Sequence, residues 1–372
     1  LLKERRKLSI INKIFLWLNY IIAVFLLISV SAKYISPLLF WLPAFFGLAF
    51  PFLFFINLFY IFYWLFQFKS GIIISISTLL LCLPTAFNYI QFNTSNKLEQ
   101  SNQIKITSYN CMLFDLYQWK KNKGNRIKIL KNLAEINPDI LCLQEFFTSE
   151  ENNNFNNITD VKKILKINYH HTEYTATRKS KKHWGIATFS KYPILNEGKM
   201  IFDTKNNNLC IYSDILINND TIRVYNIHLQ SISFSKTDNK FIDDLVSDNI
   251  SNDVENSKNI IKRLKIAFIK RAQQVDMIVA HLKTCKYKII LCGDFNDTGA
   301  SYSYENLSKN LKDSFIEKGN GLGQTYAGNW PQFRIDYILH SPLFTCLNYI
   351  RSPITFTDHY PITAVLKLPD NK

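Results

Sequence analysis

Polar side chains that could hold a metal ion or move a proton stand at the ends of several apolar runs. The run "YKIIL" leads directly into "CGDFND" (292–297), which supplies Asp294 and Asn296. Gly, Asp and Asn are also common turn formers, so this segment alone favours an ordinary turn after a strand. The pattern recurs along the chain, however, and the recurrence points to chemistry. The further strand-end residues are Asn110 in "TSYNC", Glu145 in "LCLQE", Asn226 and His228 in "YNIHL", Asp336 in "RIDYIL", and Asp358 and His359 in "TDHYP".

Together these residues supply the groups that hydrolysis of a phosphate ester requires. Asp336 lies within an apolar run, where an unpaired carboxylate is costly, and a histidine is its natural partner. Hard oxygen ligands suit Mg²⁺, which binds proteins through one or two carboxylates and keeps several waters. A carboxylate could orient or deprotonate the attacking water, and His and Asn could stabilise charge on the phosphoryl oxygens. The residue types therefore favour a metal-dependent phosphoesterase.

The order of these motifs resembles that of a known family. The order YN, QE, NxHL, GDFN, RIDY, DHYP, over residues 104–368, is similar to the endonuclease/exonuclease/phosphatase (deoxyribonuclease I-like) superfamily. The segment "WGIATFSKYPI" (184–194) also looks like a frequent segment of that family. The resemblance implies an α/β fold, a four-layer α/β sandwich in which two packed sheets are flanked by helices. It also implies a divalent cation cofactor, Mg²⁺ or Mn²⁺.

By the same resemblance, four of the strand-end residues would hold the metal and activate water. Glu145 would be the principal metal ligand, with Asn110 beside it and Asp358 completing or flanking the site. Asp294 would activate the attacking water.

The remaining strand-end residues would bind the substrate and stabilise the reaction. His228 and His359 would contact the scissile phosphate, and Asp336 would orient His359. Asn296 would hold the phosphate, and Asn226 would join His228 and Asn296 in substrate binding.

The elements that must position these residues alternate along the chain in the manner of an α/β domain. Several strand-like runs are apolar on both faces, as in sheets covered on both sides. Helical spacing appears over 125–136 and again around 258–282, whereas 150–157 and 235–257 are polar and predict loops. The expected strands are "IKITSYN", "DILCLQE", "GIATFS", "LCIYSDILI", "TIRVYNIHL", "YKIILCGDF", "RIDYIL" and "PITAVLKL".

The first 92 residues differ in composition and predict a transmembrane anchor of about three helices. Charge-free stretches of spanning length occur at 14–32 and 71–92, and the first would reach about 28 Å as a helix. Between them, 34–68 contains three prolines in its first half, so one long helix over about 45–68 is favoured over two crossings. Residues 93–103 read as a short linker and 104–372 as the catalytic domain.

Charge predicts the orientation of this anchor. Five basic residues precede the first span and only Lys33 follows it, so the N-terminus is expected in the cytoplasm. Three crossings would then place the catalytic domain outside the cytoplasm, as in an integral protein of a bacterial inner or cell membrane. Four crossings would reverse that placement.

Net charge leaves two classes of substrate open. Of the total charge of +15, residues 1–100 carry +6 and the remainder carries +9, which suits an anionic substrate or surface. Confinement near the lipid bilayer favours lipid-linked phosphate esters, while the same charge would attract nucleic acid. The alternatives are therefore a membrane-anchored nuclease acting on extracellular DNA or RNA, and a catalytically inactive binding module of the same fold. No protein partner is inferable from the sequence.

Overall fold

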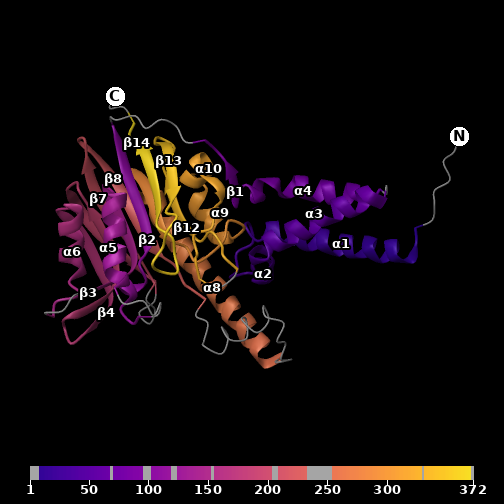
Figure 1. The fold of residues 1–372 in the computed structure, drawn as a ribbon, viewed down its shortest axis with the longest axis horizontal. Coiled ribbons are helices and arrows are strands. Elements are labelled where there is room, and N and C mark those ends of the chain that lie inside the picture. The colour runs from indigo at the N-terminus through magenta and orange to yellow at the C-terminus, as the bar shows by residue number, and fades with distance from the viewer. Residues whose placement is uncertain are drawn as a thin grey trace.

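Two six-stranded sheets form the centre of the molecule in the computed structural model (Figure 1). The structure describes residues 8–67, 70–94, 102–118, 124–151, 155–202, 208–232, 254–328 and 331–369. The first sheet has the order β13-β14-β2-β3-β5-β4 and the second β10-β12-β9-β8-β7-β6. The strands of the first are β2 (Gln103–Asn110), β3 (Ile140–Ser149), β4 (Tyr169–Arg178), β5 (Lys182–Ser190), β13 (Thr345–Arg351) and β14 (Ile362–Lys367). Those of the second are β6 (Ile194–Ile201), β7 (Leu209–Ile217), β8 (Asp220–His228), β9 (Lys288–Asp294), β10 (Lys312–Asp313) and β12 (Asp336–His340).

The sheets pack face to face, and helices cover their outer faces. One buried apolar cluster joins Ile106 and Ile140 of the first sheet to Val224 and Ile290 of the second. Separate clusters hold the helices on the outer faces. These helices are α5 (Asn125–Ile136), α6 (Asn157–Leu165), α8 (Val254–Thr284), α9 (Tyr302–Ser308) and α10 (Ser314–Lys318), with a 3-10 turn η1 (Met112–Asp115). The predicted α/β fold with two sheets flanked by helices is confirmed.

Strand register gathers the strand-end residues at one edge of the two sheets. β2 and β3 run parallel, as do β8 and β9, so each pair ends at the same side. His228 lies opposite Asp294 in the β8–β9 ladder. The antiparallel β12 begins where β9 ends and places Asp336 opposite the same Asp294. Residues far apart in the sequence therefore meet around the end of β9.

The N-terminal residues form a helical bundle that extends away from the sheets (Figure 1). It comprises α1 (Ile10–Ser31), α2 (Leu42–Leu48), α3 (Phe50–Gln67) and α4 (Ile72–Ala86). By length and composition, α1 and α3 are able to cross a membrane. The C-terminal ends of α1 and α4 and the N-terminal end of α3 lie toward the sheets, and their opposite ends lie away from them (Figure 1).

The observed helices differ from the predicted spans at their boundaries. Instead of one helix over 45–68, the chain forms α2 and then α3, with Pro51 in the first turn of α3, where its missing N–H costs nothing. The helix expected over 71–92 ends at Ala86, and after a turn over residues 87–89 the chain forms β1 (Ile90–Phe92). β1 pairs with β11 (Asn320–Leu322) of the catalytic domain.

Several polar contacts fix the bundle to the catalytic domain. Lys33 Nζ lies 2.9 Å from Glu305 Oε2, and Asn88 Nδ2 donates to the Gly299 carbonyl at 2.7 Å. Asn93, the first residue of the expected linker, donates through Nδ2 to the Ile316 carbonyl at 2.8 Å. The linker's beginning is thus held against the domain, and its residues 95–101 lie outside the described part of the chain.

Gly293 is required where β9 approaches β8, which gives the first testable prediction. Its φ is +146°, and a Cβ added there would lie 2.0 Å from the Ile227 carbonyl oxygen. We expect Gly293→Ala to lower the free energy of unfolding by about 3 kcal/mol, because the clash is with backbone. Urea unfolding of the full-length protein in detergent micelles measures this.

The matched control is Gly124→Ala, at another positive φ (+94°) where an added Cβ meets no atom within 4 Å. That change carries only the backbone strain of about 1–2 kcal/mol. Equal losses in the two variants would contradict the assigned role of the β8–β9 approach.

Candidate active site

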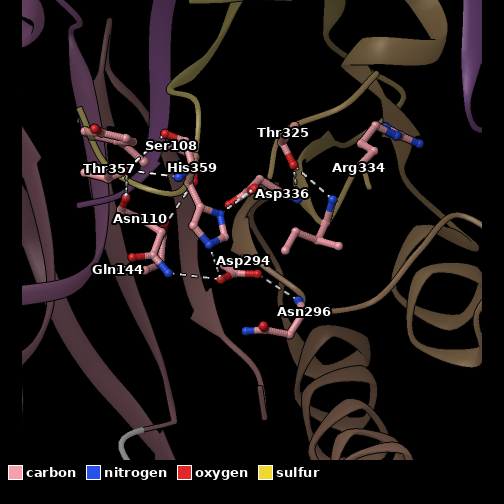
Figure 2. Close-up of polar contacts among 12 residues, drawn as sticks. Ser108, Asn110, Gln144, Asp294, Asn296, Thr325, Arg334, Asp336, Thr357 and His359 are labelled. Carbon is pink, nitrogen blue, oxygen red and sulfur yellow. Dashed lines mark hydrogen bonds and ion pairs between the residues drawn. The ribbon is translucent and has the colours of Figure 1, made fainter. Parts of the chain in front are cut away.

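Asp294 is almost fully buried at the end of β9 and lies at the centre of the strand-end residues, with His359, Asn110 and Asn296 around it in Figure 2. Its Oδ1 accepts from the Asn296 backbone N–H at 2.8 Å, and its Oδ2 accepts from Asn110 Nδ2 at 3.0 Å. The Nε2 atoms of His359 and His228 lie 3.7 and 3.8 Å from the same Oδ2. Burial raises the pKa of the Asp294 carboxyl, although the histidines and Asn110 oppose that rise. Asp294 is therefore a carboxylate with increased basicity at the centre of the site.

Asp336 holds His359 from the other side of the imidazole ring. His359 Nδ1 and Asp336 Oδ2 are 2.9 Å apart, and both residues are buried. Burial opposes protonation of His359, but the carboxylates of Asp336 and Asp294 outweigh it and hold its pKa well above the usual value. The Asp336 backbone N–H donates to Thr325 Oγ1 at 3.0 Å. His359 is thus a fixed imidazolium aimed at Asp294.

His228 has the opposite charge state. Burial lowers its pKa, so the imidazole is neutral, and Asp294 opposes this only in part. Its Nε2 lies 3.7 Å from Glu145 Oε1 and has no hydrogen-bond partner among the described residues. Two histidines whose pKa values move in opposite directions suit different roles, one cationic and one neutral.

Glu145 faces the opening of the site from a distorted strand. Its φ is +47°, an unusual value for a residue other than glycine, and the β3–β5 register shifts between Leu143 and Phe146. The side chain keeps 35 % exposure. Burial raises the pKa of Glu145 to about 7, with Asp358 and Asp294 adding to the rise and His359 opposing it. Such mutual repulsion of carboxylates is relieved when a cation binds among them.

Asn226 and Gln144 form a layer beneath these residues. Gln144 Nε2 donates to Asn226 Oδ1 at 2.7 Å and to Ser108 Oγ at 3.2 Å. Asn226 Nδ2 donates to the Ala187 carbonyl at 2.9 Å, and both amides are fully buried. This placement favours a positioning role for Asn226 over the substrate contact expected from the sequence. Sequence reasoning passed over Gln144, although it immediately precedes Glu145 in "LCLQE".

Sequence reasoning also missed Thr357 and Tyr326. Thr357 looks like an ordinary turn residue, and no strand pattern surrounds Tyr326. Thr357 Oγ1 accepts from the His359 backbone N–H at 3.0 Å and donates to the Asn110 carbonyl at 3.2 Å. The Tyr326 ring stands edge-on to His359, with centroids 5.4 Å apart. Burial raises the pKa of Tyr326 to about 12, and the charge of Asp358 adds to the rise. The phenol therefore keeps its proton and can donate a hydrogen bond.

The donor set fits a divalent metal ion. Asp294, Asp336 and His359 each offer a ligand atom within 4.8 Å of the others. Glu145 lies on the exposed side of this cluster, and the Asn110 carboxamide contacts Asp294. Carboxylate and amide oxygens are the ligands that Mg²⁺ and Mn²⁺ accept. The structure thus places Asn110, His228, Asp336 and His359 around Asp294, with Glu145 beside His228, while the roles of all the predicted site residues stay predictions.

Comparison with known proteins agrees with this geometry. The model of the endonuclease/exonuclease/phosphatase family matches residues 107–359, and a domain of unknown function matches residues 12–89. No curated protein matches the chain.

Several solved structures share the fold. An endonuclease/exonuclease/phosphatase from Beutenbergia cavernae DSM 12333 is similar with a TM-score of 0.52 and 13 % identity, over 72 % of each chain. A family protein from Bacteroides thetaiotaomicron gives 0.50 and 19 %, over 73 % of this chain and 99 % of that one. Humanized D. rerio TDP2, with 14 mutations, gives 0.50 and 14 %, over 72 % and 99 %. At such identities the likeness shows the fold.

The family match covers most of the chain, and the fold and the residue cluster agree with it. The chain belongs to the endonuclease/exonuclease/phosphatase family. Its buried cluster of two aspartates and a histidine is that of a phosphoesterase.

The Asp336–His359 pair generates the second prediction. In Asp336→Asn the imidazole loses the adjacent charge that raises its pKa, so His359 deprotonates at lower pH. If the reaction needs the imidazolium, turnover should fall about 100-fold with KM nearly unchanged, since the charge acts mainly in the transition state. The alkaline limb of the pH–rate profile should also move to lower pH. Steady-state hydrolysis of an aryl phosphate ester over a pH series measures both.

Asp214→Asn is the control, because Asp214 is a buried carboxylate paired with Arg223 at 2.6 Å outside the site. This variant shows how far the loss of a buried ion pair outside the site lowers turnover. An Asp336→Asn enzyme with unchanged turnover and a raised KM would contradict the role assigned to the pair.

Proposed function

We propose that the protein is a membrane-held, divalent-metal-dependent phosphoesterase that acts on lipid-linked phosphate esters. The observation that carries this proposal is the attachment of the helical bundle beside the active site. Asn88 Nδ2 donates to the Gly299 carbonyl, and Tyr89 Oη donates to Thr298 Oγ1 at 3.0 Å. Residues 298 and 299 follow Asn296 almost directly, so the bundle contacts the loop that carries the site.

The distribution of side chains in the bundle supports its insertion in a membrane. Its outward surface is apolar, with Trp17, Phe66 and Leu81 more than two-thirds exposed. Its interior instead contains polar residues such as Asn19 and Ser75, which are fully buried and hydrogen-bonded to each other at 3.0 Å. This arrangement inverts that of a water-soluble domain and is favourable where lipid surrounds the helices.

The number of crossings and the charge bias support a proposal for the side of the membrane on which the enzyme works. α1 and α3 are long and apolar enough to cross, and we propose that the shorter apolar helix α4 crosses as well. Three crossings would separate the N-terminus from the catalytic domain. With the basic N-terminal residues in the cytoplasm, the catalytic domain is extracytoplasmic. The active site would lie at the outer surface of a cell membrane.

We place the metal ion, Mg²⁺ or Mn²⁺, at the Glu145 side of the cluster. Glu145 would be the principal ligand, with Asn110 and Asp358 completing the site. We assign His359 to the substrate phosphate and not to the ion, because its Nδ1 pairs with Asp336 and the adjacent carboxylates favour its protonated form. When bound, the ion supplies charge neutralisation and polarises the phosphoryl oxygens.

The chain's own residues divide the remaining work. Asp294, with its raised pKa, takes a proton from the attacking water. Asn296 uses one amide N–H to bond the Leu229 carbonyl at 3.0 Å and has a second for a phosphate oxygen. His359 supplies positive charge where negative charge develops on the phosphoryl group. His228, as a neutral imidazole, donates or accepts a hydrogen bond on the other side of Asp294.

A comparison of substrates tests the proposed function. Full-length protein in mixed micelles, loaded with Mg²⁺, should hydrolyse phosphatidate or polyprenyl-phosphate substrates at least tenfold faster than single- or double-stranded DNA or RNA. Chelation by EDTA should abolish the hydrolysis. Phosphate release and product chromatography measure the rates.

The other outcomes separate the alternatives. Rapid cutting of nucleic acid without lipid hydrolysis would make the protein a membrane-anchored nuclease. Binding of phosphate esters without turnover of any would make it an inactive module of the same fold.

A further inference from the structure

An apolar cavity of about 230 Å³ lies where the bundle meets the catalytic domain. Its walls come from three segments, namely the start of α3, the junction of α4 with β1, and the residues between β11 and β12. The apolar lining includes Phe50, Phe52, Phe55, Tyr89, Leu322 and Phe333. The cavity therefore belongs to neither domain alone.

Aromatic contacts join the walls, one of them within the N-terminal part and one across the domain boundary. Phe50 and Tyr89 stack with centroids 5.4 Å apart, and Phe52 meets Phe333 edge-on at 6.3 Å. Phe52 comes from the bundle and Phe333 from the catalytic domain, so the cavity depends on the docked arrangement.

The cavity offers its occupant almost no charge. Among the described residues that line it, Arg334 is the charged one. Its Nη1 pairs with Asp313 Oδ2 at 2.7 Å, whereas its buried Nε and Nη2 have no hydrogen-bond partner among the described residues. In Figure 2 its guanidinium points away from His359 and Asp294. A nucleic-acid strand instead requires a positively charged groove along its backbone. The lining suits a hydrocarbon.

One wall of the cavity continues into the outer surface of the bundle. Phe55 lines the cavity and is also 64 % exposed on α3. The exposed face continues along the same helix through Phe59 and Phe62. If α3 lies in a membrane, lipid chains contact this face, and the cavity is adjacent to them.

The opposite wall continues into the active site. Gln324 lines the cavity. The next residue, Thr325, accepts a hydrogen bond from the Asp336 backbone N–H, and the ring of Tyr326 packs against His359. A single residue, Thr325, thus separates a cavity wall from the ring that contacts the catalytic histidine. Tyr89 also joins the two sites, because it lines the cavity and bonds Thr298 of the active-site loop.

We propose that this cavity binds a hydrocarbon chain of the lipid whose phosphate ester occupies the active site. The inference rests on the proposed function and adds to it a specificity site for the substrate's apolar part. Burial of the chain contributes binding energy roughly in proportion to the apolar area removed from contact with water. Long-chain substrates should therefore be preferred over short-chain ones with the same head group.

Photocrosslinking tests occupancy without relying on turnover. Full-length protein is placed in phosphatidylglycerol vesicles with phosphatidate that carries a diazirine on its acyl chain. We expect labelled peptides from both walls, at 50–55 and at 331–334. Residues 331–334 belong to the catalytic domain, so label there distinguishes the cavity from lipid around the bundle. Label confined to outer positions such as Trp17 and Leu81 would overturn the proposal.

A cavity-filling variant tests the effect on specificity. Ala86 ends α4 at the cavity wall, and Ala86→Phe should slow hydrolysis of long-chain phosphatidate at least tenfold. Turnover of a short-chain, water-soluble phosphatidate should stay within twofold. Leu81→Phe, on the exposed face of the same helix, is the matched control and should change neither rate. Equal losses on both substrates in Ala86→Phe, or no loss on either, would overturn the proposal.

The two proposals fail in distinguishable ways. If wild-type protein cuts nucleic acid and not lipid, the proposed function fails, and the crosslinking result alone decides whether the cavity holds a chain. If wild-type protein hydrolyses lipid, but label misses 331–334 and Ala86→Phe spares long-chain turnover, only the cavity inference fails.

Discussion

Repulsion among carboxylates at one edge of the sheets is the constraint on which the rest of the structure depends. Glu145, Asp294, Asp336 and Asp358 lie close together where water is partly excluded. Burial raises the pKa of Glu145 and of Asp294, and the neighbouring carboxylates add to both rises. The imidazolium of His359 balances part of this charge through Asp336 and Asp294. A bound cation would balance the rest, so the same electrostatics that make the site costly to assemble make it selective for divalent metal.

The backbone geometry of the strands holds these charged side chains in place. Parallel pairing of β8 with β9 sets His228 against Asp294, and Gly293 permits the close approach that this register needs. The bulge at Glu145 turns one carboxylate outward from the ladder. The bundle then contacts the loop after Asn296, so the elements that we assign to the membrane and to the chemistry share a boundary. On this account, the position of the substrate lipid and that of the reacting phosphate are set by one rigid junction.

The sequence predicted the fold class and the gathering of the strand-end residues because buried strands leave a strong apolar signal. It missed β4, whose sequence "YHHTEYTATR" is polar because much of the strand is exposed. The pairing of β1 with β11, and the cavity beside it, could not be predicted, since both depend on contacts between residues more than 200 positions apart. Tyr326 was missed for a similar reason, because its place beside His359 comes from an isolated bridge rather than from a strand pattern.

The most direct test of the account is a calorimetric titration of the full-length protein with Mg²⁺ at pH 7, in two buffers of different ionisation enthalpy. Because the pKa of Glu145 is about 7, binding should release about half a proton, as the ion drives the carboxyl into its charged form. Glu145→Gln should lose both the binding and the proton release, while Glu150→Gln, at a mostly exposed residue in the same segment, should keep both. Mg²⁺ binding and proton release that persist unchanged in Glu145→Gln would contradict the claim that this carboxylate cluster is built around a metal ion.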